Sequence, residues 1–179
     1  MQLTLHADYS LRVLLYLAEN AERAVSTQEI SDAYGISRHH LVRVVQTLHT
    51  HSFVNVSAGR RGGASLARLP REINLGEVVR KAEPSFRIVE CFDKESNTCP
   101  IVPVCKLKKV LQDALEGFFQ VLDRYTLADL VDMPQGRRIS DLLQIALPST
   151  GGAHTTGRST FRQSTTFSPS ATGRNKARG

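Results

Sequence analysis

The first strongly patterned stretch of the chain, residues 5–19, is apolar around most of a helical wheel. Two apolar stripes run along it: Tyr9, Val13 and Leu17 in the first, and Leu11, Leu14, Leu15 and Ala18 in the second. A helix with two apolar sides is usually buried on both. We therefore expect a buried helix, with Asp8 in its first turn, where the helix dipole favours a carboxylate.

Two more helices are predicted between residues 26 and 50. Ser26-Thr-Gln-Glu29 has the spacing of a capping box and starts a helix near Thr27. Gly35 permits the left-handed turn that ends it, and Ser37 then caps a longer helix. A short helix, a glycine turn and a longer helix make a helix-turn-helix. The outer face near the start of the second helix, which normally enters the major groove, carries Ser37, Arg38, His39, His40, Arg43 and Gln46. Arginine there can bridge guanine or bind a phosphate, and both stay open.

Residues 53–68 predict a β-hairpin. Phe53 to Ser57 alternates apolar and polar residues, as a half-buried strand does. Residues 58–63 hold three glycines, which allow a tight turn, and residues 64–68 return. The tip presents Arg60 and Arg61, which suit a narrow minor groove. The hairpin is therefore predicted to be the wing of a winged helix; a merely solvated turn is the alternative.

The second half of the chain predicts helices over residues 73–82 and 104–125 and a short final helix capped by Thr126. Pro84 ends the first of these. Apolar residues recur along the long helix at steps of four and three: Leu107, Leu111, Ala114, Phe118, Val121 and Tyr125. Such a seam is typical of association between helices. We therefore expect a dimerisation helix; an internal core helix is the alternative.

The expected fold is mainly α with a small β wing. Residues 1–83 form a winged helix-turn-helix DNA-binding domain, and residues 84–133 a cysteine loop and the dimerisation helix. Residues 134–179 form a C-terminal extension. From about residue 148 this extension is rich in Gly, Ser, Thr and Arg with few large apolar residues, so we expect it to be disordered.

The distribution of charge is more informative than the net charge of +6. Residues 148–179 contain five Lys or Arg and no acids, which leaves 18 basic and 17 acidic residues in 1–147. Between Asp32 and Glu72, however, there are six arginines, four histidines and no acid. DNA can dock on such a surface without meeting a carboxylate, although chance clustering is the alternative.

The expected location is the cytoplasm. No run of 18 apolar residues suggests a membrane span. The first residues lack the basic-then-apolar order of a secretory signal. Thiols stay reduced in the cytoplasm, and three cysteines are an odd number, which argues for metal or redox chemistry over a disulfide framework.

All three cysteines, Cys91, Cys99 and Cys105, lie in one short stretch that Pro100 and Pro103 interrupt. The prolines predict a loop, which lets three sulfurs turn toward one centre. Soft thiolates select zinc or iron–sulfur clusters. The spacing is wider than a zinc knuckle, and three thiolates leave a site one ligand short. Three unrelated thiols stay open as the alternative.

These residues resemble the nitric-oxide-sensing branch of the IscR/BadM-like winged-helix regulators over about residues 1–133. The similar motifs are residues 8–18 (DYSLRVLLYLA), 34–38 (YGISR), Gly62-Gly63, the three-cysteine loop and residues 125–131 (YTLADLV). Each motif alone is weak, and together they are highly specific.

The resemblance implies a homodimer with an iron–sulfur cluster on Cys91, Cys99 and Cys105. In this branch an aspartate that matches Asp8 supplies the fourth ligand from the other subunit. The IscR branch uses a histidine three residues beyond the last cysteine, where this chain has Lys108. A 4Fe–4S cluster is favoured, and 2Fe–2S stays open because the gap between Cys91 and Cys99 is longer than in some relatives.

The resulting hypothesis is a repressor that binds a double-stranded DNA operator while its cluster is intact and releases it when nitric oxide reacts with the cluster. The alternative is a winged-helix regulator that senses thiol oxidation or zinc through the same cysteines. A third class, an iron–sulfur enzyme or electron carrier, leaves the arginine-rich region without a purpose. No Ser/His/Asp set, phosphate loop or acidic pair indicates an enzyme.

Overall fold

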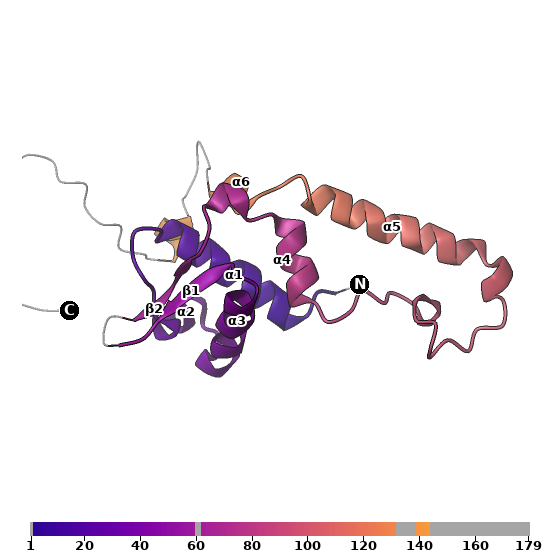
Figure 1. Cartoon of the computed structure of the whole chain (residues 1–179), viewed down its shortest axis with the longest axis horizontal. Coiled ribbons are helices and arrows are strands. Elements are labelled where there is room, and N and C mark those ends of the chain that lie inside the picture. The colour runs from indigo at the N-terminus through magenta and orange to yellow at the C-terminus, as the bar shows by residue number, and fades with distance from the viewer. Residues whose placement is uncertain (1, 60–61, 132–138, 144–179) are drawn as a thin grey trace, which may run out of the picture. The chain divides into compact units, whose positions relative to one another are not determined.

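The computed structural model describes residues 2–59, 62–131 and 139–143, which belong to one compact unit, residues 1–147. The helices are α1 Leu5–Glu19, α2 Thr27–Tyr34, α3 Arg38–Thr50, α4 Leu75–Ala82, α5 Lys106–Leu122, α6 Leu127–Val131 and α7 Ile139–Leu142, and the strands are β1 Val54–Ser57 and β2 Gly63–Leu66 (Figure 1). Single 3-10 turns lie at Pro70–Glu72, Glu90–Phe92 and Val102–Val104. The predicted fold class is confirmed. The predicted disorder from about residue 148 falls outside the described residues.

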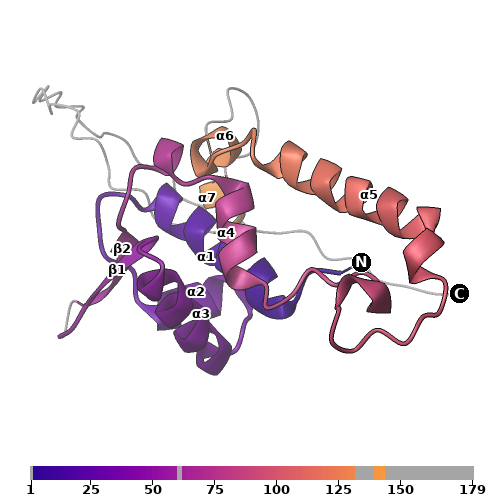
Figure 2. The same cartoon turned by 45° about the vertical axis from the view of Figure 1, so that its right-hand side comes forward.

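Helix α1 runs through the middle of the fold, as its two apolar stripes predicted. It contacts α3, α4, α6 and β2, and Figures 1 and 2 place α4 on one side of it and α2 and α3 on the other. Val13 and Leu14 are completely buried, and the same core contains Leu41 of α3, Phe53 and Ile73. The buried side of α3 carries Leu41, Val44, Val45 and Leu48, which recur at helical spacing. No helix among the described residues has both the length and the apolar character needed to cross a membrane.

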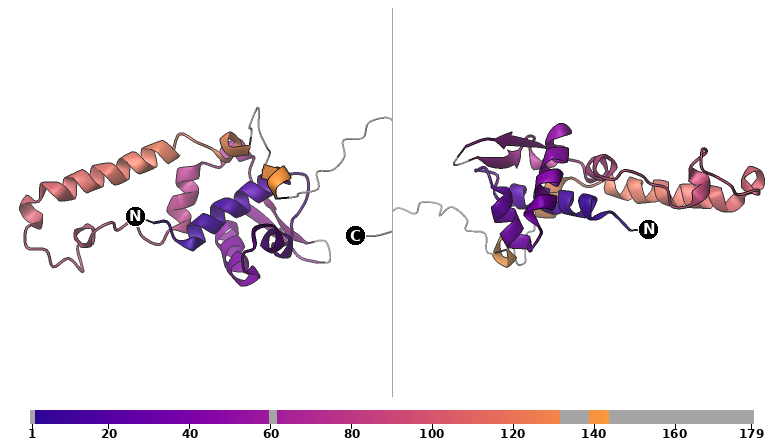
Figure 3. Two further views of the ribbon diagram at one scale, coloured as in Figure 1. Left: turned by 180° about the vertical axis from the view of Figure 1, so that it is seen from behind. Right: turned by 90° about the horizontal axis from the view of Figure 1, so that it is seen from below.

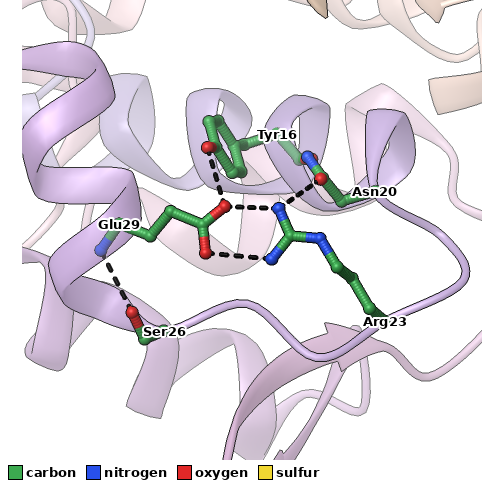
Figure 4. A network of polar contacts seen from close by, with 5 residues as sticks. All are labelled: Tyr16, Asn20, Arg23, Ser26 and Glu29. Atoms are coloured by element: carbon green, nitrogen blue, oxygen red, sulfur yellow. Dashed lines mark hydrogen bonds and ion pairs between the residues drawn. The ribbon is translucent and has the colours of Figure 1, made fainter. Parts of the chain in front are cut away.

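The start of α2 is held by a polar network rather than by the predicted capping box. Ser26 Oγ accepts the backbone N–H of Glu29 at 3.1 Å, as predicted. The Glu29 carboxylate, however, binds the guanidinium of Arg23 and accepts the Tyr16 hydroxyl at 3.1 Å (Figure 4). Arg23 also donates to Asn20 Oδ1 at 2.6 Å. The network ties the end of α1 and the α1–α2 connection to the first turn of α2.

This network sets a pH window for stability. Hydrogen bonds from Arg23 lower the pKa of Glu29, so its stabilising contribution is present above the usual carboxyl pKa and is lost as the pH falls through the lowered value. Burial, followed by the nearby Glu29 charge, raises the pKa of Tyr16 to about 12, so its contribution is lost as the pH rises from 10 toward 12.

We expect Glu29→Gln to weaken the fall in melting temperature that acid causes in the wild type. The substitution should change the free energy of unfolding by less than about 1 kcal/mol, because the side chains of Arg23 and Glu29 are both partly exposed. An unchanged fall in melting temperature would contradict this role.

The wing is a two-stranded antiparallel hairpin in which Val54 pairs with Leu66 and Ser57 with Gly63. The predicted first strand began one residue early, since Phe53 is a buried core residue before β1. On the edge of β2 that faces away from β1, the backbones of Ala64 and Val25 exchange two hydrogen bonds of 2.8 Å. These bonds attach the wing to the connection before α2. A Cβ at Gly63 would overlap the Val25 backbone, and the close approach therefore requires glycine.

Gly63→Ala is expected to destabilise the fold by about 1–3 kcal/mol, because a backbone neighbour can move aside only by distorting the bridge. Gly117→Ala is the matched control. Gly117 lies in α5, and a Cβ there would meet no atom within 4 Å. That substitution should stabilise the helix by about 0.5–1 kcal/mol. Urea denaturation measures both, and equal effects of the two substitutions would contradict the steric explanation.

Helix α4 starts later than predicted. The predicted helix included Asn74, but in the structure Asn74 is the N-cap, and its side chain accepts the Glu77 N–H at 3.1 Å. Ile73 is buried just before the helix. Thr126 directly precedes α6, as predicted, but the Asp129 carboxylate is the acceptor of the capping bonds: the Thr126 N–H and hydroxyl donate to Asp129 Oδ2 at 2.6 and 2.7 Å. Helix α6 is not the last helix, since α7 follows.

The end of α5 is fastened to α4. Both terminal nitrogens of Arg80 bind the Asp123 carboxylate, at 2.6 and 2.7 Å, and the guanidinium lies 4.1 Å from the Phe119 ring centroid. The Asn74 amide donates to the Asp123 carbonyl at 2.8 Å. A Cβ at Gly76 would overlap the Asp123 carboxylate, which leaves only glycine room for this contact. These contacts attach the C-terminal end of α5 to α4.

Over the rest of its length α5 is an open helix. It is shorter than the predicted span of 104–125, and none of its residues is buried in the single chain. Leu107 and Val110 are 63% and 60% exposed. Both views in Figure 3 show α5 extending from the body that contains α1 and the wing. The alternative of a core helix within one chain is therefore contradicted.

Candidate DNA interface and cysteine loop

The exposed face of α3 carries the residues predicted to read DNA. Ser37, Arg38, His39, His40 and Arg43 are all exposed. Ser37 occupies the N-cap position but makes no side-chain capping bond, so the predicted cap is positional only. Its hydroxyl lies at the end of α3 that enters a major groove in helix-turn-helix proteins.

His40 differs from its neighbours because its ring packs on α1. The His40 and Tyr9 rings are stacked with centroids 6.2 Å apart, and the Arg12 guanidinium lies 5.8 Å from the Tyr9 centroid. Arg12 in turn forms two contacts with Asp8, at 2.7 and 3.1 Å. A continuous row of side chains therefore joins Asp8 on α1 to the exposed face of α3.

The wing tip was predicted to present Arg60 and Arg61, and both lie outside the described residues. The flanking turn is described: Gly59 has a φ of +107°, which favours glycine, and its carbonyl accepts the Gly62 N–H at 2.9 Å. A Cβ at Gly62 would overlap the Ser57 carbonyl. The glycines of the tip thus have a steric reason that is independent of any ligand.

Not every arginine of the acid-free stretch is a surface cation. The Arg68 guanidinium lies 4.7 Å from the centroid of the buried Phe53 ring, and its two terminal nitrogens are 3.3 Å from the Glu77 carboxylate. Arg68 therefore packs at the base of the wing, between Phe53 and Glu77 of α4. The basic surface is centred on Arg38 and Arg43 of α3.

The three cysteines lie on the segment between α4 and α5. Cys91 is in the 3-10 turn Glu90–Phe92, Cys99 follows a turn, and Cys105 is the N-cap of α5. All three are free thiols and partly buried. The predicted loop is confirmed, apart from the short 3-10 turns at Glu90–Phe92 and Val102–Val104.

Polar contacts hold the loop together around two carboxylates. Glu90 accepts the backbone N–H and the hydroxyl of Thr98, the latter at 2.7 Å. Asp93 accepts the Ser96 hydroxyl at 2.7 Å and pairs with Arg87. Hydrogen bonds from Thr98 lower the pKa of Glu90, and those from Ser96 lower the pKa of Asp93. Both side chains are thus committed to loop structure.

The donor set fits a thiophilic metal or cluster, because three unpaired thiols come from one loop. The single chain does not gather them: within the described part of the chain, no three His, Cys, Asp or Glu side chains could together hold a metal ion. Asp8 lies on α1 in its ion pair with Arg12. The four predicted ligands are therefore present but not assembled.

The ion pair between Asp8 and Arg12 was not predicted from the sequence, although the spacing of the two residues indicates it. Aspartate and arginine four residues apart on a helix form a favourable pair, and Asp8 and Arg12 have this spacing. The Arg80–Asp123 pair has no such signal, because the two residues are far apart in sequence and meet only through the packing of α4 on α5.

A helix-turn-helix with a glycine-rich wing and a basic, unobstructed recognition helix defines a DNA-binding transcriptional regulator. The family model described as "Iron-dependent Transcriptional regulator" matches residues 3–133, and the chain belongs to this family, Rrf2. The match to regulators of transcription also agrees with the prediction that the chain is not an enzyme.

Curated relatives and solved structures are consistent with this family. The chain is 49% identical over 132 residues to the HTH-type transcriptional regulator NsrR of Bacillus subtilis, covering 73% of this chain and 90% of that protein. NsrR of Shouchella clausii is 47% identical, with 73% and 89% covered. The solved structure of T. potens IscR is similar with a TM-score of 0.60 at 26% identity, covering 76% of this chain and 94% of that one. CymR, the global cysteine regulator of B. subtilis, has a TM-score of 0.57 at 26% identity, with 73% and 95% covered. The resemblance found in the sequence is confirmed.

Proposed function

We propose that this chain is a dimeric repressor that binds an operator and releases it in response to nitric oxide, through an iron–sulfur cluster on Cys91, Cys99 and Cys105. The observation that carries the proposal is the position of three free thiols on one loop between the DNA-binding head and the open helix α5. The similarity to proteins named NsrR supports it.

Operator binding is assigned to α3 and the wing. Arg38, His39 and Arg43 project from the exposed face of α3 and suit the major groove, with Ser37 at its entrance. Arg60 and Arg61 at the wing tip are proposed to contact the minor groove. Two such heads in one dimer would bind a palindromic site.

Dimerisation is assigned to α5, which has large apolar side chains and no buried residue in the single chain. An exposed apolar helix of this length is expected to associate with a second copy. The Arg80–Asp123 junction would then hold each head at a fixed angle to the shared helix pair.

The cluster would be held by three thiolates of one subunit and by the partner subunit's Asp8, since Lys108 stands where the IscR branch has its histidine. We favour 4Fe–4S, and 2Fe–2S is the other form. When bound, such a cluster supplies an iron with a hard, weakly held oxygen ligand, which is where nitric oxide would react.

The contacts of Asp8 indicate how its state could affect DNA binding. In the single chain, Asp8 is held by Arg12, which also lies over Tyr9, and Tyr9 stacks on His40 of α3. An Asp8 engaged elsewhere would leave Arg12 without this partner and alter the packing beside His40. A hundredfold change in operator affinity requires only about 2.7 kcal/mol.

The test is operator binding by the full chain, purified without oxygen, before and after stoichiometric nitric oxide. We expect tight binding before the addition and a loss of about a hundredfold after it. Iron and acid-labile sulfide counted per chain establish whether the protein was loaded. Unchanged binding by loaded protein would refute the gas response.

A second candidate is a regulator that senses thiol oxidation or binds zinc through the same cysteines. The observation that favours it is that the three thiols are free and are not gathered into a metal-holding group in the described residues of the single chain. Protein that is colourless when purified without oxygen, and whose operator binding responds to peroxide or zinc, would support this candidate.

A further inference from the structure

A recess lies between α1 and the second half of α3, beside the exposed face of α3. It has a volume of about 450 Å³ and is lined by His6, Arg43, Gln46, Thr47 and Thr50. We call it the α1–α3 recess. A smaller recess of about 230 Å³ adjoins it through His6 and Arg43 and extends toward Tyr9 and His40.

The lining of the α1–α3 recess has the chemistry of an anion site. Arginine, histidine, amide and hydroxyl groups all supply hydrogen-bond donors. No carboxylate lines either recess in the described part of the chain. The nearest acid in sequence, Asp8, is turned to Arg12. An anion in the recess would therefore meet donors without a repelling charge among the lining residues.

A polar contact between His6 and Thr47 lies in the wall of the recess. His6 Nε2 and Thr47 Oγ1 are 3.1 Å apart. If Nε2 donates its proton to Oγ1, the Thr47 hydroxyl proton is free to be donated to a third group. Thr50 is less suited, because its hydroxyl already donates to the Gln46 carbonyl at 3.0 Å. In that tautomer, His6 orients the Thr47 hydroxyl to donate to an anion.

The place of the recess beside the exposed face of α3 favours a DNA phosphate as the anion. The recess continues the exposed stripe of α3 from His39 and Arg43 through Gln46, at helical steps of four and three. When the first turns of a recognition helix lie in the major groove, the phosphates that border the groove pass the neighbouring helix. The α1–α3 recess flanks this helix, because His6 of α1 lines it together with Gln46 and Thr50 of α3.

We propose that the α1–α3 recess binds a backbone phosphate of the operator duplex. Arg43 and Thr47 are the direct ligands, with the Gln46 amide as a third donor, and His6 is a positioning residue. The proposal rests on operator binding through α3 and is independent of the cluster and of nitric oxide. It also assigns Arg43 to the phosphate backbone rather than to a base, a choice that the sequence left open.

The test measures binding of the full-length protein to the operator and to an unrelated duplex of equal length, over a range of salt concentrations. Thr47→Val removes the hydroxyl at nearly constant volume and is expected to weaken binding to both duplexes by about three- to tenfold. The two losses should be equal, because phosphate contacts carry no sequence information. Arg43→Gln should reduce the slope of log K against log salt by about one.

Two further variants act as controls. His6→Gln retains a side-chain amide near Thr47 and is expected to lose less affinity than His6→Ala, whose fold is checked by circular dichroism. Lys81→Gln removes one exposed charge from α4, outside the recess, and should leave the salt slope nearly unchanged. A fall in slope as large as that of Arg43→Gln would mean that overall charge, rather than the recess, sets the salt dependence.

The outcomes separate this inference from the proposed function. If Thr47→Val and His6→Ala bind both duplexes like the wild type while Arg38→Ala does not, the recess is not a phosphate site although α3 still reads the operator. If Arg43→Gln weakens the operator alone, Arg43 contacts a base and the assignment fails. If inorganic phosphate binds the recess in a calorimetric titration but DNA binding is unaffected by Thr47→Val, the recess holds a small anion instead.

Discussion

Serine in place of Cys99 is expected to give a protein that folds but no longer holds iron. The hydroxyl is a harder and weaker ligand for a thiophilic centre than a thiolate, and the proposed site has only three thiols in each chain. Loss of an outer-shell partner alone lowers metal affinity roughly 10–100-fold, so loss of a direct ligand should exceed this. Iron and sulfide counted in anaerobic protein provide the measurement.

The control for Cys99→Ser is Lys94→Ala, in the same loop. Lys94 is exposed and carries no ligand atom of the proposed site, so its replacement should leave the iron content unchanged. Operator binding by the Cys99 variant should not respond to nitric oxide. A Cys99→Ser protein with full iron content and a normal response would remove the basis for the proposed function.

Replacing both Arg38 and Arg43 by alanine should nearly abolish operator binding. Both side chains are exposed on α3 with no carboxylate beside them in the acid-free stretch. A good contact from arginine to a base contributes about 1–3 kcal/mol, and charge-assisted contacts to phosphate are of comparable strength. The double variant is therefore expected to lose about 30-fold or more in affinity.

The matched control for the arginine pair is the double variant Lys81→Ala and Arg124→Ala. It removes the same charge from α4 and from the turn after α5, away from α3. Its operator affinity should stay within a few-fold of the wild type at about 0.15 M salt, where distant surface charges are screened. Equal losses in the two double variants would indicate that non-specific charge, not α3, governs binding.

Sequence patterns located the winged helix well where local signals decide the structure. Helix α1 has the predicted bounds, Gly35 ends α2 with a φ of +64°, and the buried side of α3 matches its periodicity. Local signals were overruled where tertiary partners compete. The Glu29 carboxylate pairs with Arg23 instead of completing the predicted capping box. Arg68 was counted as a surface cation, but its guanidinium packs on the Phe53 ring.

The sensor half was less accessible to sequence reasoning. Prolines predicted the loop, but the spacing of Cys91, Cys99 and Cys105 cannot reveal whether the sulfurs converge, because convergence depends on residues beyond the loop and, in our proposal, on a second subunit. The Arg80–Asp123 ion pair likewise forms only when α4 and α5 pack together. The apolar periodicity of either helix alone does not predict it.

The open surface of α5 has a consequence for how the protein behaves on dilution. A helix that buries none of its residues within its own chain gains little stability from packing. If a twin supplies that packing, the law of mass action makes the helical content of α5 and the order of the adjoining cysteine loop rise with protein concentration. At low protein concentration the chain would then acquire its cofactor poorly. The cellular concentration of the protein would therefore set the fraction of copies that can act as sensors.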